Sequence, residues 1–207
     1  MSKKAKPKPE VHEYQAEMQK LLEILVHSLY TEREIFLREL VSNASDALSK
    51  VQLTTLTEEK VLDKDAELQV TISLDEEERK IVIEDSGCGM TKEELVENLG
   101  TIANSGTLKY LEQLKTENKS AENLIGQFGV GFYSVFMVSD RVELTTRSWQ
   151  EDAKAWQWSS EGGGQYEIIP VDFKQRGTRI TLFLKEDAKE FCSEWRLESI
   201  IKKYSNY

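Results

Sequence analysis

Three polar residues, Glu39, Asn43 and Asp46, recur at steps of four and three in a segment whose apolar residues have helical spacing. Residues at these steps lie on one face of a helix. That face presents an amide, which carries both a donor and an acceptor, beside carboxylates. The combination favours a surface that binds a polar ligand. The alternative is the solvated stripe of an ordinary amphipathic helix.

A second group with chemical potential is Asp85-x-Gly87-x-Gly89, which comes directly after a predicted strand. Glycines at a strand end allow positive φ angles and let a ligand approach the backbone closely. An aspartate in such a crease can accept hydrogen bonds from an exocyclic amine. The alternative is a plain turn, because Asp-Ser-Gly is common turn chemistry.

The third group is glycine-rich and runs over residues 126–132, Gly-Gln-Phe-Gly-Val-Gly-Phe. It is not a dinucleotide fingerprint, because no βαβ pattern surrounds it, and the chain has no Gly-Lys-Ser/Thr of a Walker loop. Its glycines, followed by a helical-looking stretch at 132–136, could offer backbone N–H groups to a phosphate. A packing turn is the alternative. A fourth pair, Gly177-Thr178, precedes the last predicted strand and carries no signal by itself.

The elements that must position these groups follow from periodicity. Helices are expected over 18–29 and 32–51, the second one capped by Thr31 with Glu34 as in a capping box. A hairpin is expected over 67–83, and a helix capped by Thr91 follows it. Four more strands are expected at 142–146, 155–158, 166–171 and 180–184, and a last helix capped by Asp187 carries Phe191, Trp195 and Ile201. The pattern predicts an α+β fold, a two-layer sandwich of helices over a mixed, mostly antiparallel sheet.

Composition restricts the class of protein. With 39% hydrophobic and 31% charged residues the chain is globular, and a net charge of −10 argues against a nucleic-acid partner. Two distant cysteines, Cys88 and Cys192, and two isolated histidines, His12 and His27, favour neither a disulfide framework nor a zinc site. No apolar run is long enough to cross a membrane. We expect a disordered basic tail over 1–12, a single domain over 13–207 and a cytoplasmic protein.

In this order, the four motifs together resemble the pattern of the GHKL ATPases. The strings at 34–47, 98–103 and 125–134 resemble, almost letter for letter, the ninety-kilodalton heat-shock chaperones, in particular their bacterial type. The resemblance covers the chain from about residue 13. It implies the Bergerat-type ATP-binding fold and an ATPase domain that takes ATP or ADP with Mg²⁺.

The resemblance also implies roles for individual residues. Asp85 corresponds to the carboxylate that receives the adenine amino group, helped by Thr178 and the backbone at Gly89. Asn43 corresponds to the Mg²⁺ ligand, and Glu39 to the general base that deprotonates the attacking water. The other implied ATP-binding positions are Asp46, Met90, Asn98, Gly126, Gln127, Phe128, Gly129, Val130, Gly131 and Phe132. Residues of about 100–126 correspond to the lid that closes over ATP.

Two positions depart from the family pattern. Asn104 stands where many members have a basic residue, which removes one charged contact from the lid, and Cys88 replaces an aliphatic residue between two glycines. We expect the Cys88 side chain to be buried and inert, although a lowered thiol pKa near a helix N-terminus is the alternative.

For the whole protein the resemblance implies middle and dimerisation domains outside this chain, a homodimer, client proteins and cochaperones. The chain alone is expected to be monomeric and a weak ATPase, because family members take a catalytic arginine from the middle domain. A phosphotransferase of the histidine-kinase type is disfavoured, because neither His12 nor His27 lies in a phosphoacceptor region. A nucleotide sensor that never hydrolyses ATP remains an alternative.

Overall fold

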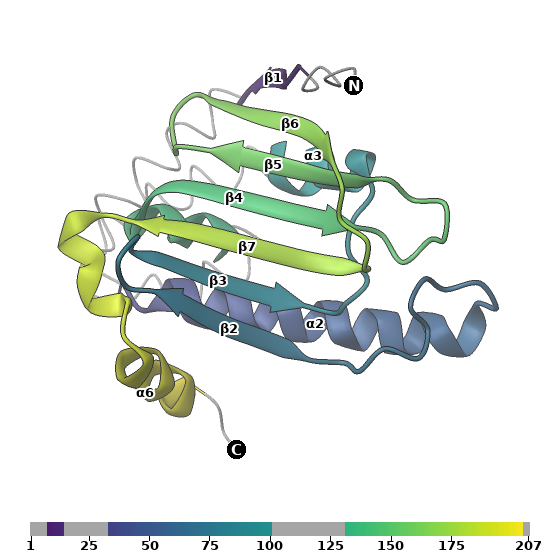
Figure 1. Ribbon diagram of the computed structural model, residues 1–207, viewed down its shortest axis with the longest axis horizontal. Coiled ribbons are helices and arrows are strands. Elements are labelled where there is room, and N and C mark those ends of the chain that lie inside the picture. Colours follow the sequence, from purple (N-terminus) through teal and green to yellow (C-terminus); the bar gives the residue numbers. More distant parts are fainter. Residues whose placement is uncertain (1–7, 15–32, 101–130, 205–207) are drawn as a thin grey trace, which may run out of the picture.

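The computed structural model describes residues 8–14, 33–100 and 131–204. Its framework is one seven-stranded sheet with the strand order β1-β6-β5-β4-β7-β3-β2 (Figure 1). Every strand pair in these described ranges is antiparallel. The α+β expectation is therefore confirmed, and the sheet contains none of the parallel pairing that a mixed sheet would have.

The strands arise from alternating side chains. β2 (Val70–Asp75) and β3 (Lys80–Asp85) form the expected hairpin, while β4 (Ser139–Arg147), β5 (Ala155–Ser160) and β6 (Gln165–Val171) form a meander. β7 (Gly177–Leu184) lies between β3 and β4 and joins the hairpin to the meander. In β3, β4 and β7 alternate residues are largely buried, and in the edge strand β2 half-buried residues alternate with exposed ones, as a sheet covered on one face requires.

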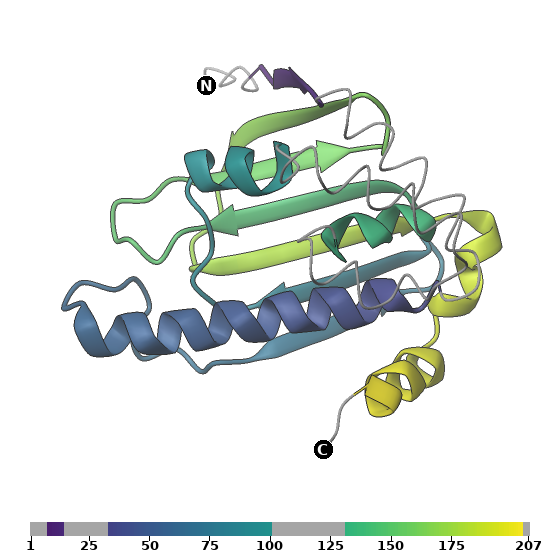
Figure 2. The ribbon, with the colours of Figure 1, turned by 180° about the vertical axis from the view of Figure 1, so that it is seen from behind.

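Helices cover one face of the sheet and leave the other open (Figures 1 and 2). The long helix α2 (Ile35–Thr57) runs along β2 and β3, with α3 (Lys92–Gly100) and the 3₁₀ helix η1 (Gly131–Met137) behind the meander. The core lies between these layers. It contains Phe36, Leu37 and Leu40 from α2, Leu95 from α3, Val135 from η1, and Trp158, Ile180 and Leu182 from the sheet.

The edge strand β1 (Glu10–Glu13) pairs with β6 from Glu10 to Glu13. The expected tail over 1–12 therefore extends too far, because residues 10–12 belong to the sheet. Four residues with mostly polar side chains give no alternation signal. The strand is held by its pairing with β6, by the His12 ring stacked on that of Tyr166, and by hydrogen bonds from Lys92 to Glu10. The helix expected over 18–29 and the Thr31 cap lie outside the described residues.

Two helix ends differ from expectation. α2 begins at Ile35, and Glu34 makes no side-chain cap there. Asp187 lies inside a separate 3₁₀ helix, η2 (Glu186–Phe191), and accepts a hydrogen bond from Arg33 (3.1 Å) instead of capping the last helix. That last helix, α6, runs over Glu194–Tyr204, so Phe191 is not part of it.

The helix start at Thr91 is confirmed. The Thr91 hydroxyl accepts a hydrogen bond from the Glu94 backbone N–H (3.2 Å), and the Glu94 carboxylate accepts one from the Thr91 N–H (2.8 Å). This reciprocal pair is a capping box, which fixes the first turn of α3. The loop that carries Gly87 and Gly89 therefore leads into a helix whose start is well defined.

Candidate functional site

A cavity of about 400 Å³ lies between α2, α3 and the sheet. Eight of the residues singled out in the sequence line it: Asn43, Asp46, Asp85, Gly89, Met90, Asn98, Phe132 and Thr178. They come from α2, from the end of β3 and the loop after it, from α3, from η1 and from β7. The fold therefore brings residues of all four motifs to one place, although Phe132 is the one residue of the third motif among them in the described part of the chain.

One face of α2 divides into a buried and an open part at this cavity. Leu40 and Ala44 are buried against the core, while Asn43 and Asp46 are exposed beside them and line the hollow. The helix face predicted from the residue spacing thus places Asn43 and Asp46 beside a cavity of ligand size. This argues against a stripe that merely faces bulk solvent.

Asp85 lies at the inner wall, at the end of β3 and opposite Thr178 of β7. Its carboxylate is buried and accepts a hydrogen bond from the Gly87 N–H (2.9 Å). Burial raises the pKa of Asp85 to about 6, although hydrogen bonds from the Gly87 and Thr178 backbone oppose the rise. A carboxylate that is costly to bury and incompletely satisfied favours a ligand that donates a hydrogen bond to it.

Two glycines beside Asp85 have backbone conformations that ordinary residues rarely adopt. Gly89 has a φ of +57° and Gly177 a φ of +117°. A Cβ at Gly89 would overlap the carbonyl oxygen of Arg147, and one at Gly177 would overlap that of Asp85. The strands and the loop can approach this closely only because both positions lack a side chain.

Thr146, which none of the sequence motifs includes, lies behind this wall. Its hydroxyl is fully buried and lies within hydrogen-bonding distance of the Met90 N–H, the Gly177 carbonyl and the Thr178 hydroxyl, at 3.0, 3.0 and 3.1 Å. A signal was present, because Thr146 is a polar residue on the inward face of β4, in line with the buried Val142 and Leu144.

Glu39 lies outside the lining of the cavity but next to the start of η1. Its Oε1 accepts hydrogen bonds from Arg38 Nε (3.2 Å) and Nη2 (3.0 Å). Its Oε2 lies so near Gly131 that a Cβ there would overlap it. The carboxylate therefore has one oxygen held by a guanidinium and the other against the glycine that ends the predicted glycine-rich loop.

Arg38 connects this carboxylate to the last helix. Its guanidinium lies over the Tyr204 ring, 5.4 Å from the centroid. The Tyr204 hydroxyl donates a hydrogen bond to Glu34 (2.9 Å), and Glu34 also pairs with Arg196 and Lys203. The hydrogen bond from Lys203 lowers the pKa of Glu34 and thereby favours its charged form. α6 is thus fastened to the first turn of α2, next to Glu39.

The remaining lining residues shape the cavity. The Asn98 amide nitrogen lies 3.6 Å from the Met90 sulfur, and the Phe132 ring packs edge-on against Trp158. Lys50 and Glu94, neither of which the sequence analysis assigned to the site, also line the cavity. Gly126, Gln127, Phe128, Gly129 and Val130 lie outside the described residues, as do Asn104 and all of the expected lid except Gly100.

The cysteines behave as structural residues. Cys88 and Cys192 are both buried and unpaired, and burial raises the thiol pKa of each. The expectation of a buried Cys88 is confirmed, and its pKa moves opposite to the lowered value that a reactive thiol needs. Within ranges 8–14, 33–100 and 131–204, no three His, Cys, Asp or Glu residues are grouped to hold a metal, and no helix is long and apolar enough to cross a membrane.

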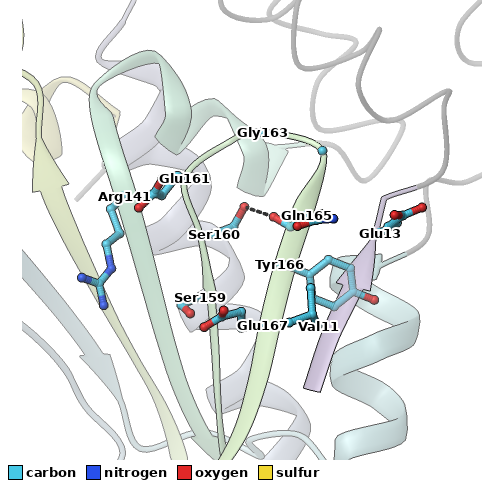
Figure 3. Close-up of a pocket in the computed structure, with 11 residues that line it drawn as sticks. Val11, Glu13, Arg141, Ser159, Ser160, Glu161, Gly163, Gln165, Tyr166 and Glu167 are labelled. Carbon is cyan, nitrogen blue, oxygen red and sulfur yellow. Dashed lines mark hydrogen bonds between the residues drawn. The ribbon is translucent and has the colours of Figure 1, made fainter. Parts of the chain in front are cut away.

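A second hollow, of about 660 Å³, lies beside the β5–β6 hairpin and β1 (Figure 3). Glu13, Glu161, Glu167 and Arg141 are among its lining residues, and the Ser160 hydroxyl donates to the Gln165 carbonyl (3.1 Å) across the hairpin. Although it is the larger hollow, none of the predicted residues line it. The α2 cavity is the better functional site, because it holds a buried carboxylate and strained glycines together.

Residues 30–187 match the family model described as histidine kinase-, DNA gyrase B-, and HSP90-like ATPase. The chain is 56% identical over 196 residues to the chaperone protein HtpG of Chlorobium chlorochromatii, which covers 94% of the chain and 31% of that protein. It is 51% identical to HtpG of Wolinella succinogenes and 49% identical to HtpG of Desulfotalea psychrophila, in each case over 95% of the chain. The chain spans about a third of the length of these relatives.

Proposed function

The chain belongs to the family of histidine kinase-, DNA gyrase B- and HSP90-like ATPases, and from this we propose that it is the nucleotide domain of an ATP-driven molecular chaperone. The observation that supports this most is the convergence of Asn43, Asp85 and Thr178 on one cavity of ligand size. Similarity to the HtpG chaperones supports the chaperone part of the proposal.

In this proposal the inner wall binds adenine. The exocyclic amine donates a hydrogen bond to Asp85, which lies buried with unfilled acceptor capacity. Thr178 and the backbone at Gly89 and Met90 complete the wall, and Gly89 leaves room for the base to approach the chain. Asn98 and Phe132 line the space next to this wall, where the ribose and the α-phosphate would lie.

The outer part of the cavity suits phosphates and Mg²⁺. Asn43 would supply an amide oxygen to the ion, Asp46 lies one turn further along α2, and the glycine segment 126–131 would surround the phosphates. Mg²⁺ commonly takes one or two protein oxygens and completes its shell with phosphates and water. The exposed amide of Asn43, without a cluster of carboxylates in the described part of the site, fits that requirement. When bound, the ion would offset the negative charge of the phosphates.

Hydrolysis requires a group that orients water, and we assign this role to Glu39. The water oxygen would attack the γ-phosphorus while the bond to the β-phosphate oxygen breaks, and the water proton would pass to the Glu39 carboxylate. Arg38 holds Oε1, so Oε2 beside Gly131 is the oxygen available for the proton. The lid of about 100–126 would exclude water once ATP is bound.

The whole protein, of which this chain corresponds to about a third in its relatives, would use this cycle to act on client proteins. We propose that it is a cytoplasmic homodimer with further domains, that cochaperones regulate it, and that the present domain is monomeric and hydrolyses ATP slowly alone. Neither a nucleic acid nor a membrane belongs among the proposed partners.

The proposal is tested by titrating this chain with ADP and with ATP in the presence of Mg²⁺, by calorimetry and thermal unfolding. Saturation at a hundred times Kd should stabilise the fold by about 2.7 kcal/mol. The absence of heat and of a thermal shift with both nucleotides would contradict the proposal. Turnover by the whole protein is the second measurement. Binding without any turnover would identify a nucleotide sensor, and so remove the enzymatic part of the proposal.

A further inference from the structure

The buried Thr146 hydroxyl stands behind the proposed adenine wall and does not line the cavity. It has three polar neighbours in two segments of the chain: the Met90 N–H before α3, and the Gly177 carbonyl and the Thr178 hydroxyl at the start of β7. A threonine hydroxyl has one proton and two lone pairs. Three neighbours use all of them, so the direction of each bond can be worked out.

Two of the directions are fixed by chemistry. The Met90 N–H can only donate, so it takes one lone pair of Thr146, at 3.0 Å. The Gly177 carbonyl can only accept, so it takes the proton of Thr146, also at 3.0 Å. The second lone pair of Thr146 then remains for Thr178, 3.1 Å away. The Thr178 hydroxyl must donate its proton inward to Thr146, and only its lone pairs face the cavity.

Thr178 therefore joins Asp85 as an acceptor. The two residues are direct partners in the β3–β7 ladder, and both line the cavity. Two neighbouring acceptors match an amino group and repel a carbonyl oxygen. Asp85 alone would not reject hypoxanthine, because the N1–H of that base can donate to a carboxylate. Its O6 carbonyl would then meet the lone pairs of Thr178.

We infer that Thr146 is a specificity-determining residue, which holds the Thr178 hydroxyl as an acceptor and so makes the cavity select the 6-amino group of adenine over the 6-carbonyl group of hypoxanthine or guanine. The inference rests on the proposed nucleotide function and deepens it. Thr146 acts through Thr178 and touches no ligand, so it is a positioning residue.

The experiment compares ADP with inosine diphosphate, both with Mg²⁺, by calorimetry on the wild-type chain, Thr146→Val and Thr146→Ser. Valine keeps the shape of threonine but has no hydroxyl, so Thr178 becomes free to donate to a 6-carbonyl. We expect Thr146→Val to reduce the preference for ADP over inosine diphosphate by about tenfold, the typical worth of one hydrogen bond to a polar group. Thr146→Ser, which keeps the hydroxyl, should retain the wild-type preference.

A second variant separates this role from a structural one. Thr178→Val should reduce the preference as Thr146→Val does, and the double variant should reduce it no further. A Thr146→Val variant that weakens both nucleotides equally would overturn the inference. If Thr146→Val fails to fold, an unchanged preference in Thr178→Val would overturn it as well. A wild-type chain that binds neither nucleotide would instead contradict the proposed function.

Discussion

The two ends of the α2 cavity are built differently. At the inner end, Asp85, Thr178 and Thr146 lie on neighbouring strands, and their polar partners are backbone groups of Gly87, Gly177 and Met90. Beyond the outer end, outside the cavity lining, Glu39 is held by the side chain of Arg38, which in turn lies over Tyr204 of α6. The first end depends on the hydrogen-bonded sheet, and the second on an ion pair within α2 and a cation–π contact with α6.

This difference has a physical consequence. Buried hydrogen bonds to backbone groups are costly to break, because the groups left behind are not solvated. Ion pairs near the surface contribute about 0–1 kcal/mol and are easily rearranged. Nucleotide recognition at the inner end should therefore be rigid, whereas the position of Glu39 can respond to whatever moves α6. The following variants test the contrast, beginning with the largest expected effect.

Gly89→Ala tests the rigidity of the inner end. The new Cβ would overlap the Arg147 carbonyl oxygen, at a φ of +57° that alanine disfavours. We expect a loss of at least ~2 kcal/mol in the free energy of unfolding, measured with urea, because backbone strain of this kind alone costs about 1–3 kcal/mol. Gly163→Ala is the matched control, since a Cβ there meets nothing within 4 Å. Equal stability of the two variants would contradict the rigid inner end.

Asp85→Asn should weaken ADP binding by about ten- to hundredfold, because it removes a charge-assisted hydrogen bond worth ~1.5–3 kcal/mol. In the absence of nucleotide the same change should stabilise the fold at neutral pH, since the carboxylate that is costly to bury is gone. Calorimetry and urea unfolding measure the two effects. Asp140→Asn changes the same charge at an exposed position and should alter neither.

Gly131→Ala tests the outer end by adding a methyl group at a glycine, as Gly89→Ala does at the inner end. Here the new Cβ would meet Oε2, Cδ and Cγ of Glu39, a side chain that can rotate away, and no backbone atom is among its nearest neighbours. We expect stability to change little and the turnover of the whole protein to fall by about tenfold or more. General-base catalysis typically accelerates a reaction by about 10²–10⁴-fold, and a displaced base loses much of this acceleration. A stability loss as large as that of Gly89→Ala would remove the contrast between the two ends.

The pH dependence follows from Asp85. Its pKa is about 6 in the fold against 3.8 in the unfolded chain, so the folded protein binds more protons between these values. The free energy of unfolding without nucleotide should therefore decrease as pH rises from about 4 to 6. ADP binding needs the ionised carboxylate, so its affinity should fall by up to about tenfold per pH unit below pH 6.

Comparison with Asp85→Asn isolates this contribution, because the phosphates of the nucleotide titrate in both proteins. The unfolding curve of Asp85→Asn should lack the decrease between pH 4 and 6. If wild type and variant have the same pH profile, the carboxylate is not the group that titrates.

Tyr204→Ala should have the smallest effect. It removes the ring beneath Arg38 and the hydrogen bond to Glu34, and so loosens the guanidinium that holds Glu39. We expect turnover of the whole protein to change by a few fold with ADP affinity unchanged, since contacts of this kind are worth ~0.5–1 kcal/mol at exposed sites. Lys202→Ala is the control on the same helix, because Lys202 pairs only with Glu198 in the described structure. A loss of ADP affinity in Tyr204→Ala would show that the two ends are coupled.

The sequence predicted the parts of the fold that rest on local patterns. Strands with alternating side chains, the helix carrying Glu39 and Asn43, and the capping box at Thr91 all follow from spacing and chemistry within a few residues. β1 was not predicted because it forms by pairing with β6, a strand more than 150 residues away in the sequence, and its own side chains do not alternate. The separation of η2 from α6 was missed because Asp187 has a partner, Arg33, that lies 154 residues away in the chain.

The residues of the candidate site also divide into those that local sequence patterns predict and those that depend on distant contacts. Asn43, Asp85 and Thr178 were predicted because motif order and resemblance point to them. Thr146 was not, because its role depends on neighbours in two distant segments of the chain, Met90 before α3 and Gly177 and Thr178 in β7. Its polar side chain on an inward strand face was nevertheless a usable signal. The convergence of Glu34, Arg38 and Tyr204 could not be predicted either, since no sequence pattern relates the last helix to the first turn of α2.

The central position of β7 has a consequence for biosynthesis. β2 and β3 can pair as soon as they are made, and so can β4, β5 and β6, but the two groups meet only through β7. Until residues 177–184 have left the ribosome, β3 and β4 each present an unpaired edge. Such edges are templates for pairing with other chains. A nascent chain that stalls before Gly177 is thus open to aggregation at both of these strands, and the strand that protects them is the last of the seven described strands to be translated.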